Sequence, residues 1–193
     1  MRFDPETLLD AYAQGAFPMA DEDGKIRWYT ADPRGVLPLE TFHIPRTLGQ
    51  IIRQNKFEIR INCDFEGAMR ACMATRLGDR TWINEELIAA YVRLHKLGHA
   101  HSVEAWREGK LAGGLYGVSL GAAFFGESMF HHQRDASKVA LAALVDRLRE
   151  RGYELLDTQT CSEHLKRFGG VEISEEEYLA LLAKAMGREC RFD

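Results

Sequence analysis

Residues 101–130 read HSVEAWREGKLAGGLYGVSLGAAFFGESMF, and this stretch decides the fold class of the chain. It holds three runs rich in apolar residues, separated by glycine turns at Glu108-Gly109 and near Gly121. Strands joined by turns this short pair with their neighbours in the antiparallel direction. The stretch therefore predicts an antiparallel meander.

Segments with other periodicities surround the meander. Three segments have apolar residues at helical spacing, and each begins with an N-cap residue. The N-caps are Asn84 in the first segment, Asp135 or Ser137 in the second, and Ser174, which forms a capping box with Glu177, in the third. The sequence predicts helices over 84–98, 135–152 and 174–187, and further strands over 57–61 and 153–159. This order of elements is typical of an α+β domain in which helices flank an antiparallel-rich sheet.

The first 60 residues predict a small N-terminal domain. Asp4 and Pro5 begin a short helix that ends at Gly15, and the proline- and glycine-rich residues 17–40 form turns and short extended pieces. The predicted boundaries are 1–60 for this domain and 61–193 for the larger C-terminal domain.

Composition limits the class of protein. The 193 residues are 46% hydrophobic and 28% charged, as in a globular domain, and no apolar run approaches the roughly 20 residues that span a bilayer. The N-terminus lacks the apolar stretch of a secretory signal, so we expect a cytoplasmic protein without membrane contact. Its net charge of −4 means that binding to a nucleic acid would require a local basic patch.

Two groups of acidic and amide side chains are candidates for chemistry. Asp157 and Gln159 lie two residues apart in a predicted strand, so they should share a face, where the carboxylate could hydrogen-bond the amide. The alternative is that the two residues form an ordinary pair at the end of a strand, which reaches solvent or caps the next turn. Glu127 lies among apolar residues and needs a partner, which could be an amine, a backbone N–H or Arg134.

Metal binding is not expected. His95, His99, His101 and the pair His131-His132 show neither an H-E-x-x-H arrangement nor a cysteine at ligand spacing. The four cysteines are scattered without a C-x-x-C pair, which predicts reduced thiols.

Several separated motifs occur together in one order along the chain. They are LLxAYxxGxFP (8–18), WYTADPRGVL (28–37), TWI (81–83), AYxxLHxLGHAHSVExW (90–106), GGLYGV (113–118), FFGESMF (124–130), ASK (136–138) and LLDTQ (155–159). Through these motifs the chain strongly resembles the leucyl/phenylalanyl-tRNA-protein transferase family.

The resemblance implies a two-part protein whose C-terminal domain has a GCN5-related, acetyltransferase-like fold. It implies transfer of Leu, Phe or Met from aminoacyl-tRNA to proteins that begin with Arg or Lys, which marks them for degradation. The reaction is an ester aminolysis and needs no metal or small cofactor. A monomer is expected.

The resemblance also assigns roles to residues. Asp157 would orient Gln159, Gln159 would contact the attacking amine, and Glu127 would hold the aminoacyl group or that amine. Trp82 would pack near the terminal adenosine of the tRNA. The pocket for the apolar side chain would be lined by Leu115, Phe124, Leu141, Leu144 and Leu156.

The chain departs from the family pattern at the substrate contacts. Met19 replaces an aromatic residue beside the adenosine, and Ser162 replaces an asparagine that follows the glutamine. The basic patch for tRNA is thinned to Arg46, Arg53 and Lys56, so we expect a shallower salt dependence of tRNA binding.

Two other functions are compatible with parts of the sequence. An N-acetyltransferase that uses acetyl-CoA would need a pyrophosphate loop of the form Q/R-x-x-G-x-G/A, which no segment matches. A non-catalytic tRNA-binding module is the other, and the presence of Glu127, Asp157 and Gln159 argues against it.

Overall fold

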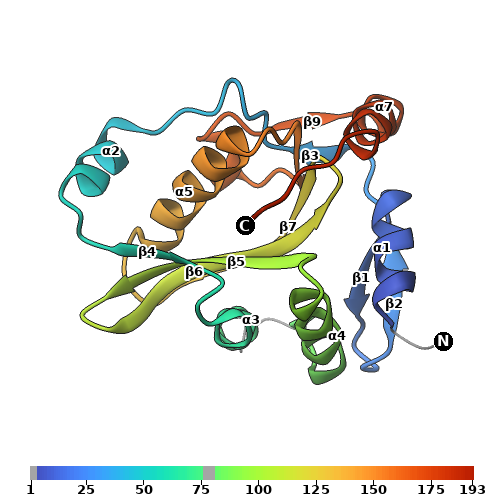
Figure 1. Cartoon of the computed structure of the whole chain (residues 1–193), viewed down its shortest axis with the longest axis horizontal. Coiled ribbons are helices and arrows are strands. Elements are labelled where there is room, and N and C mark those ends of the chain that lie inside the picture. The colour runs from blue at the N-terminus through green and yellow to red at the C-terminus, as the bar shows by residue number, and fades with distance from the viewer. Residues whose placement is uncertain (1–3, 76–80) are drawn as a thin grey trace.

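The computed structural model describes residues 4–75 and 81–193, and one mixed sheet forms its centre (Figure 1). The sheet has seven strands in the order β4-β5-β6-β7-β8-β3-β9. These are β3 (Arg34–Val36), β4 (Glu58–Ile61), β5 (Ala100–Arg107), β6 (Lys110–Leu120), β7 (Ala123–His131), β8 (Leu155–Gln159) and β9 (Val171–Ile173). Only β7 and β8 pair in parallel, so the predicted meander and the antiparallel-rich sheet are confirmed.

Helices cover both faces of the sheet. They are α1 (Pro5–Ala13), α2 (Arg46–Arg53), α3 (Phe65–Ala74), α4 (Glu85–Lys96), α5 (Ala136–Glu150), α6 (Glu163–Lys166) and α7 (Glu175–Met186). In Figure 1, α5 and α2 lie on one side of β4–β6, and α3 and α4 lie on the other. Each side buries its own apolar cluster, with Leu141, Leu144 and Leu148 in one and Met69 and Leu87 in the other. The α+β class is confirmed.

Local signals in the sequence set the helix ends. The Asp4 and Asn84 side chains accept hydrogen bonds from the backbone N–H of Thr7 and Leu87, and the Ser174 capping box is present. Asp135, not Ser137, is the residue before α5, and its side chain makes no capping hydrogen bond.

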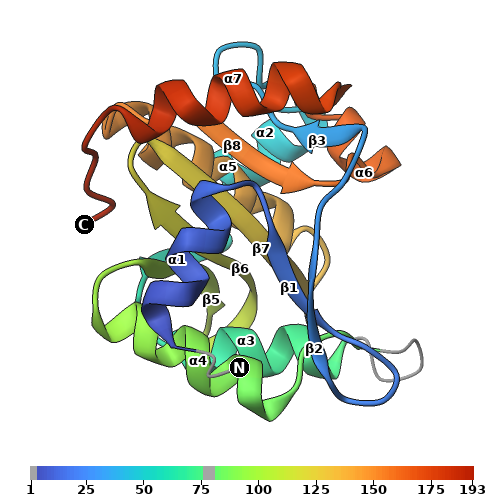
Figure 2. The same ribbon diagram turned by 90° about the vertical axis from the view of Figure 1, so that its right-hand side faces the viewer.

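The N-terminal segment runs along the sheet instead of standing apart from it. Figure 2 shows α1 and the hairpin of β1 (Phe17–Ala20) and β2 (Ile26–Tyr29) in front of β6 and β7. Residues 34–36, from the predicted N-terminal domain, and 58–61, which span its predicted boundary, form β3 and β4 of the central sheet. The division at residue 60 stays a prediction.

Gly35 brings β3 close to the segment that follows β8. A Cβ atom on Gly35 would lie 2.3 Å from the carbonyl carbon of Thr160 and 2.5 Å from the backbone nitrogen of Cys161. Only glycine permits this approach. The neighbouring Arg34 is thereby placed beside β8.

Candidate active site

A pocket of about 550 Å³ lies between the β1–β2 hairpin and strands β6–β8. Its walls are mainly apolar, and α5 and α6 contribute to one side. Most of the residues predicted to contact substrate line it: Met19, Trp82, Leu115, Leu141, Leu144, Leu156 and Ser162, together with Glu127 and Gln159. Residues from distant parts of the sequence are therefore brought together at one cavity of a size typical for a small-molecule site.

Phe124 is the exception among the residues predicted to line the pocket. Its side chain is fully buried in the core beneath α5, where its ring stacks on Phe192 at 5.2 Å between centroids. Phe124 is therefore a core residue of this structure, and its predicted contact with the substrate stays a prediction. Leu156, on the next strand, does line the pocket.

Asp157 faces away from the pocket and is held by a buried ion pair. Its carboxylate accepts hydrogen bonds from Arg34 Nε at 3.0 Å, from Arg34 Nη2 at 2.6 Å and from the Tyr178 hydroxyl at 2.7 Å. Burial lowers the pKa of Arg34, but the hydrogen bonds and the charge of Asp157 outweigh it, so the pKa is raised overall. Spacing alone did not indicate this partner.

The predicted side-chain contact between Asp157 and Gln159 is absent. Asp157 Oδ1 instead accepts from the backbone N–H of Gln159 at 2.8 Å. Gln159 has φ +57°, so the chain leaves strand geometry there and the two-residue alternation no longer applies. As a result Gln159 lines the pocket while Asp157 lies behind it.

Glu127 is held by two tyrosines. Its carboxylate accepts from the Tyr12 hydroxyl at 2.6 Å and from the Tyr91 hydroxyl at 3.3 Å, and the two hydroxyls also contact each other. Burial raises the pKa of Glu127 from its ordinary value near 4.5 to about 7, although both tyrosine hydrogen bonds act to lower it. Arg134, considered as a partner, is exposed and pairs with Asp135. Both tyrosines lie in family motifs, at the Ala-Tyr pairs of residues 11–12 and 90–91, and this was the one sign in the sequence that they belong to the site.

Three polar atoms in the pocket wall have no hydrogen-bond partner among the described residues. They are Ser128 Oγ, Thr158 Oγ1 and Gln159 Nε2, all three buried. A buried polar atom left unpaired costs about 1–3 kcal/mol, so native proteins keep few of them without a reason. Their gathering at one pocket beside Glu127 indicates a site for a polar group of a ligand.

Trp82 and Met19 lie on one side of the pocket, next to each other in the fold. The backbone N–H of Ala20, at the end of β1, donates to the carbonyl of Trp82 at 3.0 Å. This bond ties the hairpin to the segment that precedes α4. Both side chains thereby line the same cavity as the leucines.

The predicted basic patch lies elsewhere on the molecule. Arg46 and Arg53 are at the two ends of α2, and Lys56 follows it; all three are exposed and none lines the pocket. Figure 1 shows α2 at the end of the molecule opposite α1 and the hairpin.

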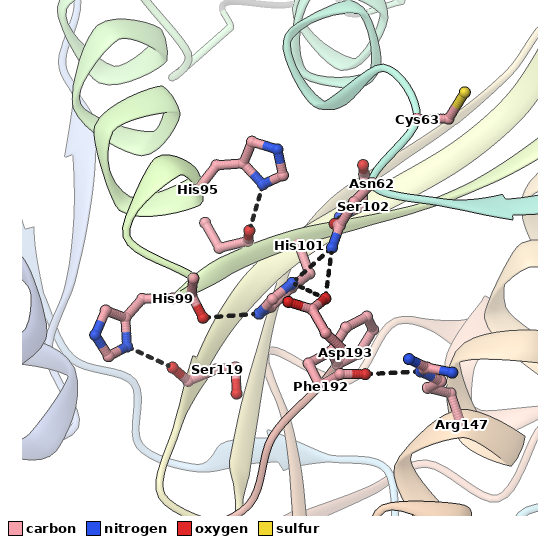
Figure 3. Close-up of polar contacts among 12 residues, drawn as sticks. Asn62, Cys63, His95, His99, His101, Ser102, Ser119, Arg147, Phe192 and Asp193 are labelled. Carbon is pink, nitrogen blue, oxygen red and sulfur yellow. Dashed lines mark hydrogen bonds and ion pairs between the residues drawn. The ribbon is translucent and has the colours of Figure 1, made fainter.

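The histidines point to separate partners. Figure 3 shows His95, His99 and His101 turned toward different partners. The Nδ1 atoms of His95 and His99 contact the carbonyls of Ala100 and Ser119, and the ring of His101 contacts Asn62 and the carbonyl of Gly98. Burial lowers the pKa of His101 to about 4. Among residues 4–75 and 81–193, no three His, Cys, Asp or Glu side chains are placed to share a metal ion.

The fold and the pocket are those of an α+β protein that can hold an apolar group next to buried polar atoms. Residues 36–183 match the family model described as leucyl/phenylalanyl-tRNA protein transferase, and residues 1–32 match the model of its N-terminal domain. The chain belongs to the leucyl/phenylalanyl-tRNA protein transferase family.

Individual relatives agree with this assignment. A Rubrobacter xylanophilus protein named leucyl/phenylalanyl-tRNA–protein transferase is 54% identical over 187 residues, or 96% of each chain. A Paramagnetospirillum magneticum protein of the same name is 53% identical over 191 residues, covering 97% of this chain and 91% of its own.

A solved structure shows the same fold at low identity. L-PGS from Bacillus licheniformis matches with a TM-score of 0.52 and 12% identity, over 96% of this chain and 71% of that one.

In the part of the chain that the structure describes, no helix has the length and apolar character to cross a membrane.

Proposed function

We propose that this protein transfers a leucyl or phenylalanyl group, or a methionyl group, from aminoacyl-tRNA to the α-amine of proteins that begin with Arg or Lys. The observation that carries the proposal is the apolar pocket that ends on Glu127 and the unpartnered amide of Gln159. Membership of the family supports it. We propose in addition that the catalytic domain has an acetyltransferase-like fold and that the reaction marks its protein substrates for degradation.

The pocket suits the acyl half of the substrate. Leu115, Leu141, Leu144 and Leu156 offer an apolar surface to a side chain that is unbranched at Cβ. Trp82 offers an aromatic face for the terminal adenosine, a contact worth about 1–3 kcal/mol per base. Met19 would add a flexible apolar contact in place of a second ring.

The polar groups of the pocket, Glu127 and Gln159, suit the ester that reacts. The acceptor amine attacks the ester carbonyl carbon, a C–N bond forms, and the bond from that carbon to the ribose oxygen breaks. Glu127, with a pKa of about 7, would take the proton that the amine loses, and the ribose oxygen gains a proton as it leaves. Gln159 would contact the attacking amine through its acceptor Oε1, and its donor Nε2 would contact the carbonyl oxygen and stabilise the negative charge that develops there.

The cellular setting follows from the substrates. Charged tRNA is a cytoplasmic molecule, so the proposed activity is cytoplasmic. We also propose that the protein acts as a monomer.

Label transfer tests the function. The protein is incubated with radiolabelled Leu-tRNA and a peptide that begins with Arg, next to a peptide identical except for an initial Ala. Label is expected on the Arg peptide only. No transfer to either peptide, together with turnover of acetyl-CoA, would instead favour an N-acetyltransferase.

Gly126→Ala is expected to change the choice of amino acid without disturbing the fold. A Cβ atom there would meet the Asp157 carbonyl oxygen at 3.5 Å and Leu156 Cδ1 at 3.9 Å, which are ordinary contacts, and Gly126 lines the pocket. One added methyl group changes discrimination by about 1–3 kcal/mol. We expect kcat/KM for Phe-tRNA to fall at least tenfold more than for Leu-tRNA. Equal effects on both substrates would show that Gly126 does not border the acyl group.

Arg53→Ala is expected to weaken tRNA binding and to reduce its salt dependence. We propose that Arg46, Arg53 and Lys56 contact tRNA phosphates, so loss of one contact should lower the slope of log Kd against log salt by about 1. Filter binding between 50 and 200 mM salt measures it. Lys96→Ala, at the exposed end of α4, is the matched control and should leave the slope unchanged.

A further inference from the structure

Asp157 has no remaining capacity to act on a substrate. Arg34 and Asp157 are 1% and 0% exposed, and the carboxylate accepts hydrogen bonds from Arg34 Nε and Nη2, from the Tyr178 hydroxyl and from the backbone N–H of Gln159. Asp157 does not line the pocket, whereas Gln159 does. Asp157 therefore acts on the reaction from behind the pocket, through its hydrogen bond to the backbone of Gln159 and through its charge, which helps to raise the pKa of Glu127.

Gln159 stands in a conformation that requires support. Its φ of +57° is uncommon for a residue other than glycine, and the backbone N–H of Thr160 donates to the carbonyl of Thr158 at 2.6 Å across it. Such a tight turn is strained and persists only where its surroundings hold it. The hydrogen bond from the Gln159 N–H to Asp157, at 2.8 Å, is one such support.

Arg34 and Tyr178 connect this support on β8 to three other elements, which are α1, β3 and α7. Arg34 Nη1 donates to the carbonyl of Gly15, just after α1, at 2.8 Å, and the guanidinium lies 4.3 Å from the centre of the Tyr178 ring. Tyr178 lies on α7 and also packs beneath Gly15. Figure 2 shows α7, β3 and the end of α1 converging near β8.

We propose that Arg34 and Tyr178 are positioning residues of the transfer reaction. They hold the carboxylate of Asp157 in the one orientation that fixes the strained turn, and the turn presents the Gln159 amide to the ester carbonyl. This inference rests on the proposed function for its kinetic consequence. Its structural consequence, the dependence of the Gln159 turn on Tyr178, does not.

Tyr178→Phe tests the proposal because it removes one hydroxyl and keeps the ring. Tyr153→Phe is the matched control, since that buried hydroxyl bonds Ser119 Oγ at 2.5 Å and Tyr153 is absent from the pocket lining. We expect Tyr178→Phe to lower kcat for leucyl transfer about tenfold with KM for Leu-tRNA within about twofold, as a small misalignment of a reacting group does. Tyr153→Phe should keep both constants within about twofold. Equal losses of kcat in the two variants, or none in Tyr178→Phe, would overturn the proposal.

Hydrogen exchange gives a second readout that does not depend on activity. The backbone amide of Gln159 should exchange at least about tenfold faster in Tyr178→Phe than in wild type or Tyr153→Phe. If wild-type protein transfers no label, the proposed function fails, and the exchange rate still decides the inference. An unchanged rate for Gln159 in Tyr178→Phe contradicts it.

Discussion

Glu127→Gln is expected to lower the rate of leucyl transfer about 10²- to 10⁴-fold and, at the same time, to make the protein more stable at pH 8. The rate falls because an amide cannot take the proton that the acceptor amine must lose. The substitution keeps the size of the side chain. A loss of rate therefore reports on the proton and not on packing.

The gain in stability follows from the raised pKa of Glu127. The pKa is about 7 in the folded protein and near 4.5 in an ordinary setting, so between these values the unfolded chain has lost a proton that the folded protein keeps. Stability is unaffected below about pH 4.5, falls as the pH rises to about 7, and then stays at the lower level. The amide that replaces the carboxyl group in the variant does not titrate, so the difference in Tm between variant and wild type should be near zero at pH 4.5 and largest at pH 8.

A buried glutamate outside the pocket serves as the control. Glu104 is 0% exposed and accepts hydrogen bonds from Ser102, from Trp106 and from the backbone N–H groups of Cys63 and Asp64. Glu104→Gln places an NH₂ group against backbone and indole N–H groups, which cannot accept a hydrogen bond, whereas the tyrosine hydroxyls around Glu127 can. Glu104→Gln should therefore lose stability and keep the transfer reaction. A Glu127→Gln variant that transfers at the wild-type rate would remove Glu127 from the mechanism.

Arg34→Met is expected to cost about 3–5 kcal/mol of unfolding free energy, because it leaves the buried charge of Asp157 without its partner. The double variant Arg34→Met/Asp157→Asn removes both charges and should be more stable than Arg34→Met alone. Chemical denaturation measures both. Arg70→Met is the control: Arg70 also binds carboxylates, those of Glu66 and Glu85, but on the surface, where such pairs contribute little to stability. A double variant no more stable than the single one would show that the loss comes from packing and not from charge.

Local patterns in the sequence predicted the parts of the fold that depend on neighbouring residues. The turn at Glu108-Gly109 has positive φ at both residues and joins β5 to β6, as the glycine spacing indicated. The capping box at Ser174 likewise needs only residues within one helical turn. Such features are determined within a few residues of chain.

The contacts of the candidate site were hidden because they join distant segments. Glu127 and Tyr12 lie 115 residues apart, and Asp157 and Arg34 lie 123 apart, so no spacing rule relates them. The Asp157–Gln159 pair was misjudged for a different reason. The alternation of strand side chains was extended to a residue whose positive φ ends the strand.

The central claim is that the pocket holds the aminoacyl end of the tRNA. The most direct test is a structure of the protein with a hydrolysis-resistant analogue, in which an amide joins leucine to the 3′ position of adenosine. The account predicts that the leucyl side chain contacts Leu141, Leu144 and Leu156. Its carbonyl oxygen should lie about 3 Å from Gln159 Nε2, and its adenine should pack on Trp82. A leucyl group bound outside this pocket, or a carbonyl directed away from both Gln159 and Glu127, would contradict the account.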